Sequence, residues 1–143
     1  MKDFFAIILN KCLSFGCYIL KPLFKKDGSV TPGYYASKLN KTILDDLKYP
    51  KYVIGVTGSS GKGSTTSMIA HILSNSGYKV VWNKNGSNLY NAAITLILNH
   101  TNPFTKKINA DVLLMELDES FISKIFFIIS PFVAKTTYFL ILL

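Results

Sequence analysis

Residues 52–66 read YVIGVTGSSGKGSTT, and this short segment constrains the fold more than any other part of the chain. The apolar run 52–57 predicts a buried strand. Gly58 and Gly61 follow it and allow a tight turn in which successive backbone N–H groups point inward. A helix is predicted over 62–76, and its N-terminus would add free N–H donors and a partial positive charge. This order of elements predicts a phosphate-binding loop.

Each residue type in this loop has a chemical role at a phosphate. The Lys62 ammonium would lie over the terminal phosphates of a nucleotide, and the Ser64 hydroxyl is placed for Mg²⁺. The general pattern G-x-x-x-x-G-K-[ST] is not met, because Val56 stands at its first glycine and Gly63 follows the lysine. The shorter G-x-x-G-K form fits, and the alternative is a Ser/Gly turn that caps a helix. The predicted phosphate-binding residues are Gly58, Ser59, Ser60, Gly61, Lys62, Gly63, Ser64 and Thr65.

Strand and helix patterns alternate after residue 51. Strands are predicted over 52–57, 79–82 and 111–115, and helices over 62–76, 89–99 and 121–127. This alternation is typical of an α/β fold in which helices pack on a parallel sheet. The first of these helices is expected to use one face made of Met68, Ile69, Ile72 and Leu73. A chain of 143 residues allows one small domain, and we expect it at 51–143 after an N-terminal helical extension at 1–50.

The N-terminal run 3–20 is apolar, but Asn10 and Lys11 interrupt it, so it is not a clean membrane span. A signal peptide is disfavoured because Asp3 interrupts the start and no small-x-small cleavage site follows. We expect a helix that docks on a partner or lies at a membrane surface.

The connection from this run to the first strand contains loop and helix signals. Glycines and a proline predict a loop over 25–33. A short helix is predicted over 36–48, ending before Pro50, with Leu39, Ile43, Leu44 and Leu47 on one side.

All sixteen basic residues are lysines, and the formal net charge is +8. The chain has no arginine for bidentate recognition of phosphate or carboxylate. The lysines are scattered and not interleaved with aromatics, so we expect no nucleic-acid partner. Their charge either coats a solvated surface or attracts the chain to anionic lipid.

The chain's only two glutamates, Glu116 and Glu119, flank Asp118 at the end of the third predicted strand. Ligands of parallel sheets bind in the crevice at this end of the strands. Mg²⁺ takes one or two carboxylates together with phosphate oxygens and waters, so Glu116 is a candidate magnesium ligand. The alternative is a solvated acidic turn that caps the next helix, and it applies most to Asp118 and Glu119.

Three segments together resemble the central ATPase domain of the Mur ligases and folylpolyglutamate synthetases. They are the G-x-x-G-K loop, the sequence NKNGSN at 83–88, similar to an N-x-x-G-x-N element, and ELDE at 116–119, similar to an E-x-D-E element. The segments 28–33 and 36–47 resemble the N-terminal region of the MurT group within this family. The resemblance covers residues 5–131.

The resemblance implies a P-loop-type Mur ligase central domain that uses ATP and Mg²⁺ in a cytoplasmic carbon–nitrogen ligase. Such a ligase phosphorylates a carboxylate, and an amine then attacks the acyl phosphate. Lys62 and Glu116 would be the catalytic residues, and Ser64 and Glu116 would hold the metal. Asn83, Asn85 and Asn88 would fix a loop that faces the acceptor, or they form a polar turn.

For the MurT group, the resemblance implies amidation of the D-glutamate carboxylate in a lipid II-type muropeptide. The ammonia would come from a glutaminase partner, GatD. If the apolar run 3–20 lies at a membrane surface, this would be the inner face of the membrane.

The resemblance stops near Pro131, so we expect an incomplete central domain. The tail 138–143 is almost wholly apolar, which resembles a frameshifted or prematurely ended reading frame, and a final buried strand is the alternative. Two other functions stay open. The pair Gly63–Ser64 favours a folylpolyglutamate synthetase-like ligase, and the incomplete domain favours a non-catalytic nucleotide-binding fragment.

Overall fold

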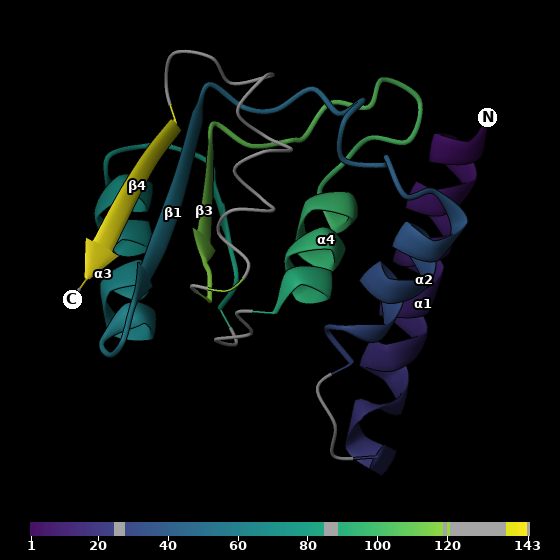
Figure 1. Ribbon diagram of the computed structural model, residues 1–143, viewed down its shortest axis with the longest axis horizontal. Coiled ribbons are helices and arrows are strands. Elements are labelled where there is room, and N and C mark those ends of the chain that lie inside the picture. The colour runs from purple at the N-terminus through teal and green to yellow at the C-terminus, as the bar shows by residue number, and fades with distance from the viewer. Residues whose placement is uncertain (25–27, 85–88, 119, 121–136, 143) are drawn as a thin grey trace.

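The computed structural model describes residues 1–24, 28–84, 89–118, 120 and 137–142 (Figure 1). The elements in chain order are α1 (Lys2–Phe24), α2 (Thr31–Leu39), β1 (Tyr52–Gly58), α3 (Lys62–Asn75), β2 (Val80–Trp82), α4 (Tyr90–Asn99), β3 (Val112–Glu116) and β4 (Thr137–Leu142). The helix predicted over 121–127 lies outside the described residues, as do Asn85, Asn88 and Glu119.

The four strands form one parallel sheet in the order β2-β3-β1-β4. This confirms the predicted alternation of strands and helices around a parallel sheet. Side chains alternate along β3, so that Leu113 and Met115 face a core shared with α1, α2 and α4, while Val112 and Leu114 face α3. The helices therefore cover both faces, with α3 on one and the other three on the opposite face (Figure 1).

The predicted apolar tail forms strand β4 of this sheet. It pairs in parallel with β1, from Val53 opposite Thr137 to Gly58 opposite Leu142. Its sequence TYFLIL is rich in aromatic and branched residues, which favour strands. Of the two interpretations of the tail, the final strand is the one that the structure shows.

Helix α1 continues without a break through Asn10 and Lys11, which anchor it to α4. Asn10 Nδ2 donates to Thr95 O at 3.3 Å and to Asn99 Oδ1 at 2.9 Å, and Lys11 Nζ donates to Asn99 O at 2.6 Å. The helix prediction is confirmed. Among the described helices, its segment Lys2–Lys21, with a mean hydropathy of 1.5, is long and apolar enough to cross a membrane.

The predictions for 25–33 and 36–48 were wrong at the helix boundaries. Helix α2 already begins at Thr31, with Pro32 in the first turn, and it ends at Leu39. Asn40 then adopts an extended conformation, and its Oδ1 accepts from the backbone N–H and the hydroxyl of Thr42, both at 3.1 Å. The turns that follow bury Ile43, Leu44 and Leu47. The three residues are thus spaced as on one face of a helix, but they are buried from turns.

The inward face of α3 also differs from the prediction. Thr66 and Ala70 are buried, and Ile69 and Leu73 pack against the sheet. Met68 and Ile72 are exposed. The predicted face was therefore half right, because Ile69 and Leu73 lie on the side that Thr66 and Ala70 share.

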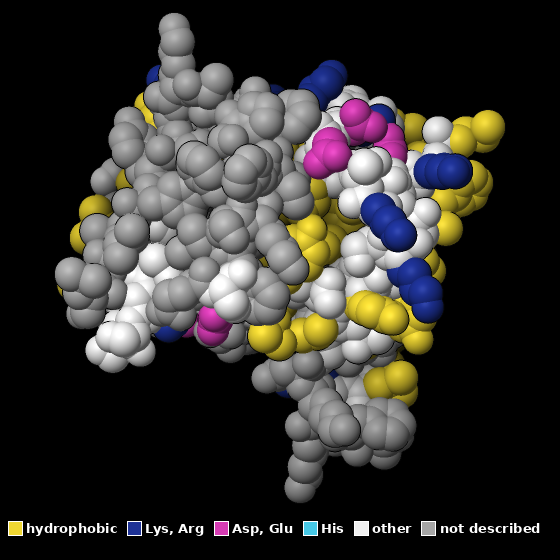
Figure 2. Space-filling model, in the orientation of Figure 1, with side chains coloured by type: hydrophobic (Ala, Val, Ile, Leu, Met, Phe, Trp, Pro, Cys, Tyr) yellow, Lys and Arg dark blue, Asp and Glu magenta, His cyan; other side chains and the backbone are white. Residues whose placement is uncertain are grey.

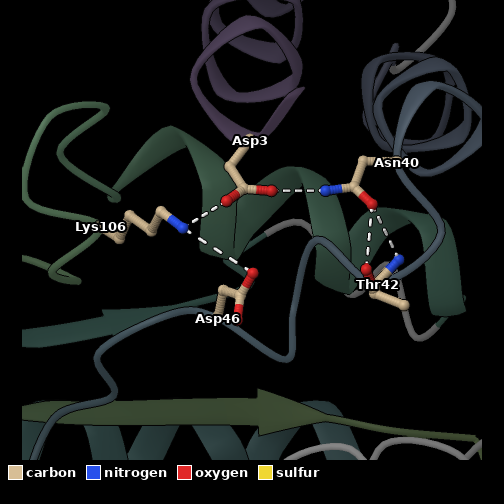
Figure 3. A network of polar contacts seen from close by, with 5 residues as sticks. All are labelled: Asp3, Asn40, Thr42, Asp46 and Lys106. Atoms are coloured by element: carbon tan, nitrogen blue, oxygen red, sulfur yellow. Dashed lines mark hydrogen bonds and ion pairs between the residues drawn. The ribbon is translucent and has the colours of Figure 1, made fainter. Parts of the chain in front are cut away.

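A polar network centred on Asp3 joins the start of α1 to two distant segments (Figure 3). The Asp3 carboxylate accepts from Asn40 Nδ2 at 2.5 Å and forms an ion pair with Lys106, which lies 3.8 Å from Asp46. The hydrogen bond to Asp3 is the main cause that raises the pKa of Lys106. This network aligns α1 with the turn after α2 and the loop before β3.

Candidate phosphate and magnesium site

The segment Gly58–Gly61, here called the glycine loop, connects the end of β1 to the start of α3. Gly58 has φ 148° and Gly61 has φ 72°, values that favour glycine because other side chains rarely adopt them. Gly61 is the residue before the helix, and no side chain caps the helix there. The first turn of α3 thus presents its backbone N–H groups toward the loop, which is an arrangement suited to an anion.

Lys62 curls back over the glycine loop. Its Nζ donates to the carbonyl oxygen of Gly58. Its positive charge also helps to lower the pKa of Asp118, although hydrogen bonds from the Ser120 hydroxyl and backbone N–H contribute more to that shift. The ammonium therefore lies at the carboxyl edge of the sheet, between the loop and the residues after β3.

Glu116 is the last residue of β3 and is only 8% exposed. Its Oε2 lies 3.4 Å from the place where a Cβ on Gly63 would stand. A Cβ at position 63 would thus be in van der Waals contact with the carboxylate, which places Glu116 beside the first turn of α3. The carboxylate and the helix N-terminus share one small space.

Asn83 holds the backbone of Glu116 in place. Its Oδ1 accepts from the Glu116 N–H at 2.8 Å, and its Nδ2 donates to the Glu116 carbonyl oxygen at 3.3 Å. On the other side of β3, the Leu117 N–H donates to Val56 O at 2.9 Å. Sequence reasoning assigned Asn83 to an acceptor loop or a polar turn and missed this role. The available signal was its position directly after β2, next to the end of β3.

Replacing Asn83 by leucine is expected to destabilise the protein by about 1–3 kcal/mol, because the N–H and C=O of Glu116 lose their partner in a buried place. Urea unfolding measures this change. The exposed neighbour Lys84 offers the control, since Lys84→Ala should change the unfolding free energy by less than about 0.5 kcal/mol. Equal stability of the two variants would show that the hydrogen bonds of Asn83 do not hold the Glu116 backbone in place.

Thr57 lies directly before the loop and is 2% exposed. Its hydroxyl oxygen is buried and has no hydrogen-bond partner among the described residues. A buried hydroxyl without a partner carries a free-energy cost, and such groups are rare in native proteins. Thr57 belongs to the last residues of β1, where the strand enters the glycine loop.

Most of the predicted site residues thus lie at the carboxyl edge of the sheet. The glycine loop, Lys62, Gly63 and Glu116 come together there. Ser64 is exposed and Thr65 is half-buried in the first turn of α3. Carboxylate, hydroxyl and backbone N–H groups of this kind can hold a phosphate together with Mg²⁺, because Mg²⁺ prefers oxygen ligands and retains phosphate oxygens and waters.

A separate hollow of about 530 Å³ lies at the opposite, amino edge of the sheet. Lys11, Lys79, Lys107 and His100 line it together with polar side chains. Partial loss of hydration, and then the charges of Lys11 and Lys79, lower the pKa of His100 from 6.5. The folded protein therefore disfavours the protonated imidazole.

The low pKa of His100 predicts a loss of stability in mild acid. The unfolded chain takes up a proton near pH 6.5, whereas the folded chain does so only at lower pH. His100 thus contributes its full stabilisation above pH 6.5 and loses it as the pH falls. Urea unfolding at about pH 7.5 and pH 5.5 should show a smaller drop in stability for His100→Asn than for the natural chain. An identical drop in both proteins would contradict the assignment.

Comparison with known proteins identifies the family. The family model of the Mur ligase middle domain matches residues 56–137, which is more than half of the chain. The chain therefore belongs to the Mur ligase middle-domain family, as its sequence resemblance predicted.

Several curated proteins are similar to the chain. The lipid II isoglutaminyl synthase (glutamine-hydrolyzing) subunit MurT of Streptococcus pneumoniae (strain ATCC BAA-255 / R6) is 32% identical over 104 residues, which are 73% of this chain and 23% of that protein. The same subunit of Staphylococcus aureus (strain COL) is 25% identical over 115 residues, 80% of this chain and 25% of that one. The UDP-N-acetylmuramate–L-alanine ligase of Wolbachia pipientis wMel is 37% identical over 91 residues, 59% of this chain and 16% of that one.

The chain thus spans a quarter or less of the length of these relatives. No solved structure matches it.

Proposed function

We propose that this chain is the ATP-binding part of an ATP-dependent carbon–nitrogen ligase of peptidoglycan synthesis. The observation that carries the proposal is the Glu116 carboxylate, which lies against Gly63 where the glycine loop meets α3. The site supplies complementary groups for a triphosphate and its metal. These groups are the backbone N–H donors of the loop, the lysine above it and the carboxylate beside it. Membership of the Mur ligase family supports the same chemistry.

Each residue has a definite part in this proposal. The N–H groups of the glycine loop and the first turn of α3, with Lys62, hold the phosphates, and Ser64 and Glu116 hold Mg²⁺. When bound, ATP would supply its terminal phosphoryl group to a carboxylate, giving an acyl phosphate and ADP, and Mg²⁺ would offset the phosphate charge. Lys62 and Glu116 contribute positioning and charge stabilisation, which account for most of the catalysis in phosphoryl transfer. Asn83 positions Glu116 through its backbone.

The names of the similar proteins support a proposal for the acceptor and the partner. The MurT relatives are named as glutamine-hydrolyzing lipid II isoglutaminyl synthase subunits. We therefore propose that the acceptor is the D-glutamate carboxylate of a lipid II-type muropeptide and that a glutaminase subunit, GatD, delivers ammonia. The alanine ligase relative is also named for a muramate substrate, which favours the cell-wall role over the folate alternative. ATP binding without ligase turnover would support the non-catalytic alternative.

A second part of the proposal concerns α1 and places the protein in the cytoplasm at the inner face of the membrane. The side of α1 that faces away from α2 and α4 exposes Phe5, Phe15 and Ile19, which are 59%, 66% and 57% exposed. Lysine and hydrophobic side chains lie together along the edge of the molecule where α1 and α2 lie (Figure 2). An apolar helix face on a protein of charge +8 suits an anionic membrane surface.

The membrane contact predicts that the protein sediments with vesicles of phosphatidylglycerol. Phe15→Asp should lower this binding by about tenfold, because a charge replaces a buried ring at the lipid interface. Tyr35→Asp makes the same change in charge at an exposed aromatic residue of α2 and should have less effect. Equal binding by both variants and the natural chain would rule out insertion of the α1 face.

Calorimetric titration with ATP, with and without Mg²⁺, tests the nucleotide site. In Glu116→Gln, whose side chain keeps its shape, ATP binding in the presence of Mg²⁺ should weaken by about tenfold, since the metal loses its protein carboxylate. Binding of ATP without Mg²⁺ should change little. Asp118→Asn is the matched control, because Asp118 hydrogen-bonds to Ser120 and should leave the metal unaffected. A Mg²⁺ dependence that persists in Glu116→Gln would remove Glu116 from the site.

A further inference from the structure

The hollow at the amino edge of the sheet, here called the amino-edge hollow, is lined by lysines from three distant parts of the chain. Lys11 comes from α1, Lys79 directly precedes β2, and Lys107 lies in the loop before β3. No aspartate or glutamate lies among the described residues that line the hollow. Three positive charges thus line a space of about 530 Å³, a volume in the range of sites that hold small molecules.

The charge of this lining is not balanced by the protein. In the described part of the chain, no carboxylate forms an ion pair with any of the three lysines. Asp111 is the acid next to them, and its Oδ2 accepts from the backbone N–H of Lys79 at 2.8 Å. Lys11 and Lys79 lie close enough to His100 to lower the pKa of its imidazole. The cationic groups therefore act on one another, and an anion between them would relieve their repulsion.

Helix α4 ends at the amino-edge hollow, but its final carbonyl oxygens already have donors. A helix C-terminus carries a partial negative charge, which by itself would repel an anion. Here Asn99 O accepts from Lys11 Nζ at 2.6 Å. The next carbonyl oxygen, His100 O, accepts from the Asn109 N–H at 2.9 Å. These bonds offset the negative end of α4 and leave the lysine charges to decide what the hollow attracts.

Two asparagine amides of the lining supply further N–H donors. Asn102 Oδ1 accepts from the backbone N–H groups of Phe104 and Thr105, at 2.9 Å and 3.0 Å. Asn99 Oδ1 accepts from Asn10 Nδ2 at 2.9 Å. Because the oxygen of each amide is engaged, each amide offers a ligand its two N–H donors. The hollow therefore combines ammonium and amide donors.

We propose that the amino-edge hollow binds the phosphate group of a small anion, either a soluble phosphate or the headgroup of a phosphomonoester lipid. The oxygens of a phosphate are arranged as a tetrahedron, so they can accept hydrogen bonds from lysines and amides that approach from several sides. The two oxygens of a carboxylate lie in one plane and suit such a lining less well. The hollow shares no residue with the glycine loop, so this proposal holds whether or not that loop binds ATP.

The two histidines of the chain allow a direct test by nuclear magnetic resonance. His100 lines the hollow, whereas His71 lies on α3 with its ring centroid 6.3 Å from that of Trp82. The full chain is titrated with inorganic pyrophosphate at about pH 7 without Mg²⁺. The ring signals of His100 should shift saturably toward the protonated form, because a bound anion favours the imidazolium. The signals of His71 should stay in place.

Half-saturation is expected at about 1 mM, since exposed lysines are screened by water and bind weakly. Lys107→Glu should raise this concentration by about tenfold, because a repulsive charge replaces an attractive one. Lys38→Glu makes the same change of charge at an exposed position of α2, outside the hollow, and should leave it unchanged. Sodium chloride at equal ionic strength should give no saturable shift.

Three results would each overturn the proposal. They are equal shifts of His71 and His100, a shift that sodium chloride reproduces, and an unchanged half-saturation in Lys107→Glu. A titration with micromolar ATP and Mg²⁺ adds a fourth condition, because this concentration is too low to fill the hollow. Lys107→Glu should then bind ATP as the natural chain does, and a loss of that binding would contradict the separation of the two sites.

Dihexanoyl phosphatidic acid, used below its micellar concentration, distinguishes the two sources of the phosphate group. Its effect on the His100 signals is compared with that of pyrophosphate. A tighter half-saturation would assign the hollow to a lipid headgroup, and an equal or weaker one would assign it to a soluble phosphate. A failure of both probes to shift His100 would overturn the proposal.

Discussion

Replacing Gly33 by alanine is expected to destabilise the protein by about 3 kcal/mol, at the upper end of overpacking effects, or to prevent α2 from docking. Gly33 lies where α2 crosses α4, and its N–H donates to the Thr95 hydroxyl oxygen at 2.8 Å. A Cβ at this position would stand 2.0 Å from the carbonyl oxygen of Asn91 and 2.9 Å from the Thr95 nitrogen. Both are backbone atoms of α4, so the two helices would have to separate.

Gly16 provides the matched control for this change. It lies within α1, and nothing stands within 4 Å of the place where its Cβ would be. Gly16→Ala should stabilise the helix by about 0.5–1 kcal/mol, because alanine has the higher helix propensity. Urea unfolding of the two variants measures both effects. A Gly33→Ala variant as stable as the natural chain would mean that α2 and α4 do not pack at this distance.

Replacing Lys62 by alanine is expected to weaken ATP binding severely. The proposed nucleotide loses a charge-assisted hydrogen bond to its terminal phosphates, which corresponds to a loss of affinity of about 100-fold. Calorimetric titration with ATP and Mg²⁺ measures it, and thermal unfolding checks that the variant still folds. Lys79→Ala, at the opposite edge of the sheet, removes the same charge and should bind ATP normally. Unchanged affinity of Lys62→Ala would refute the role of the lysine.

The alternation of strands and helices could be predicted because its signals are local. A buried strand such as β1 is a continuous apolar run in the sequence. Gly58 and Gly61 signal the turn, and the structure gives both of them a positive φ. The boundaries of β1, α3, α4 and β3 were therefore predicted to within about one or two residues. The division of the chain near residue 50 stays a prediction.

The wrong helix boundaries arose where side-chain hydrogen bonds decided the local structure. Ile43, Leu44 and Leu47 have the spacing of a helix, but hydrogen bonds from Thr42 to the Asn40 side chain stabilise a turn instead. Asn10 and Lys11 interrupt the apolar run of α1, and the sequence did not show that both side chains donate hydrogen bonds to Asn99 of α4. Hydrogen bonds between residues more than eighty positions apart leave no local pattern in a sequence.

The candidate site was predictable in its residues but not in its arrangement. The glycine loop, Lys62 and Glu116 each stand out in the sequence, and the parallel sheet brings them to one edge. Two relations could not be predicted from spacing. One is the position of the Glu116 carboxylate beside Gly63, and the other is the pair of hydrogen bonds from Asn83 to the Glu116 backbone. Both depend on the strand order β2-β3-β1, which places residues from three strands side by side.

A crystal structure of the full chain with Mg²⁺ and a non-hydrolysable ATP analogue tests the central claim most directly. The account predicts that the phosphates lie in the glycine loop and that Lys62 Nζ leaves the Gly58 carbonyl for a phosphate oxygen. The metal should lie between Ser64 and Glu116. A nucleotide bound elsewhere, or a metal that does not contact Glu116, would contradict it.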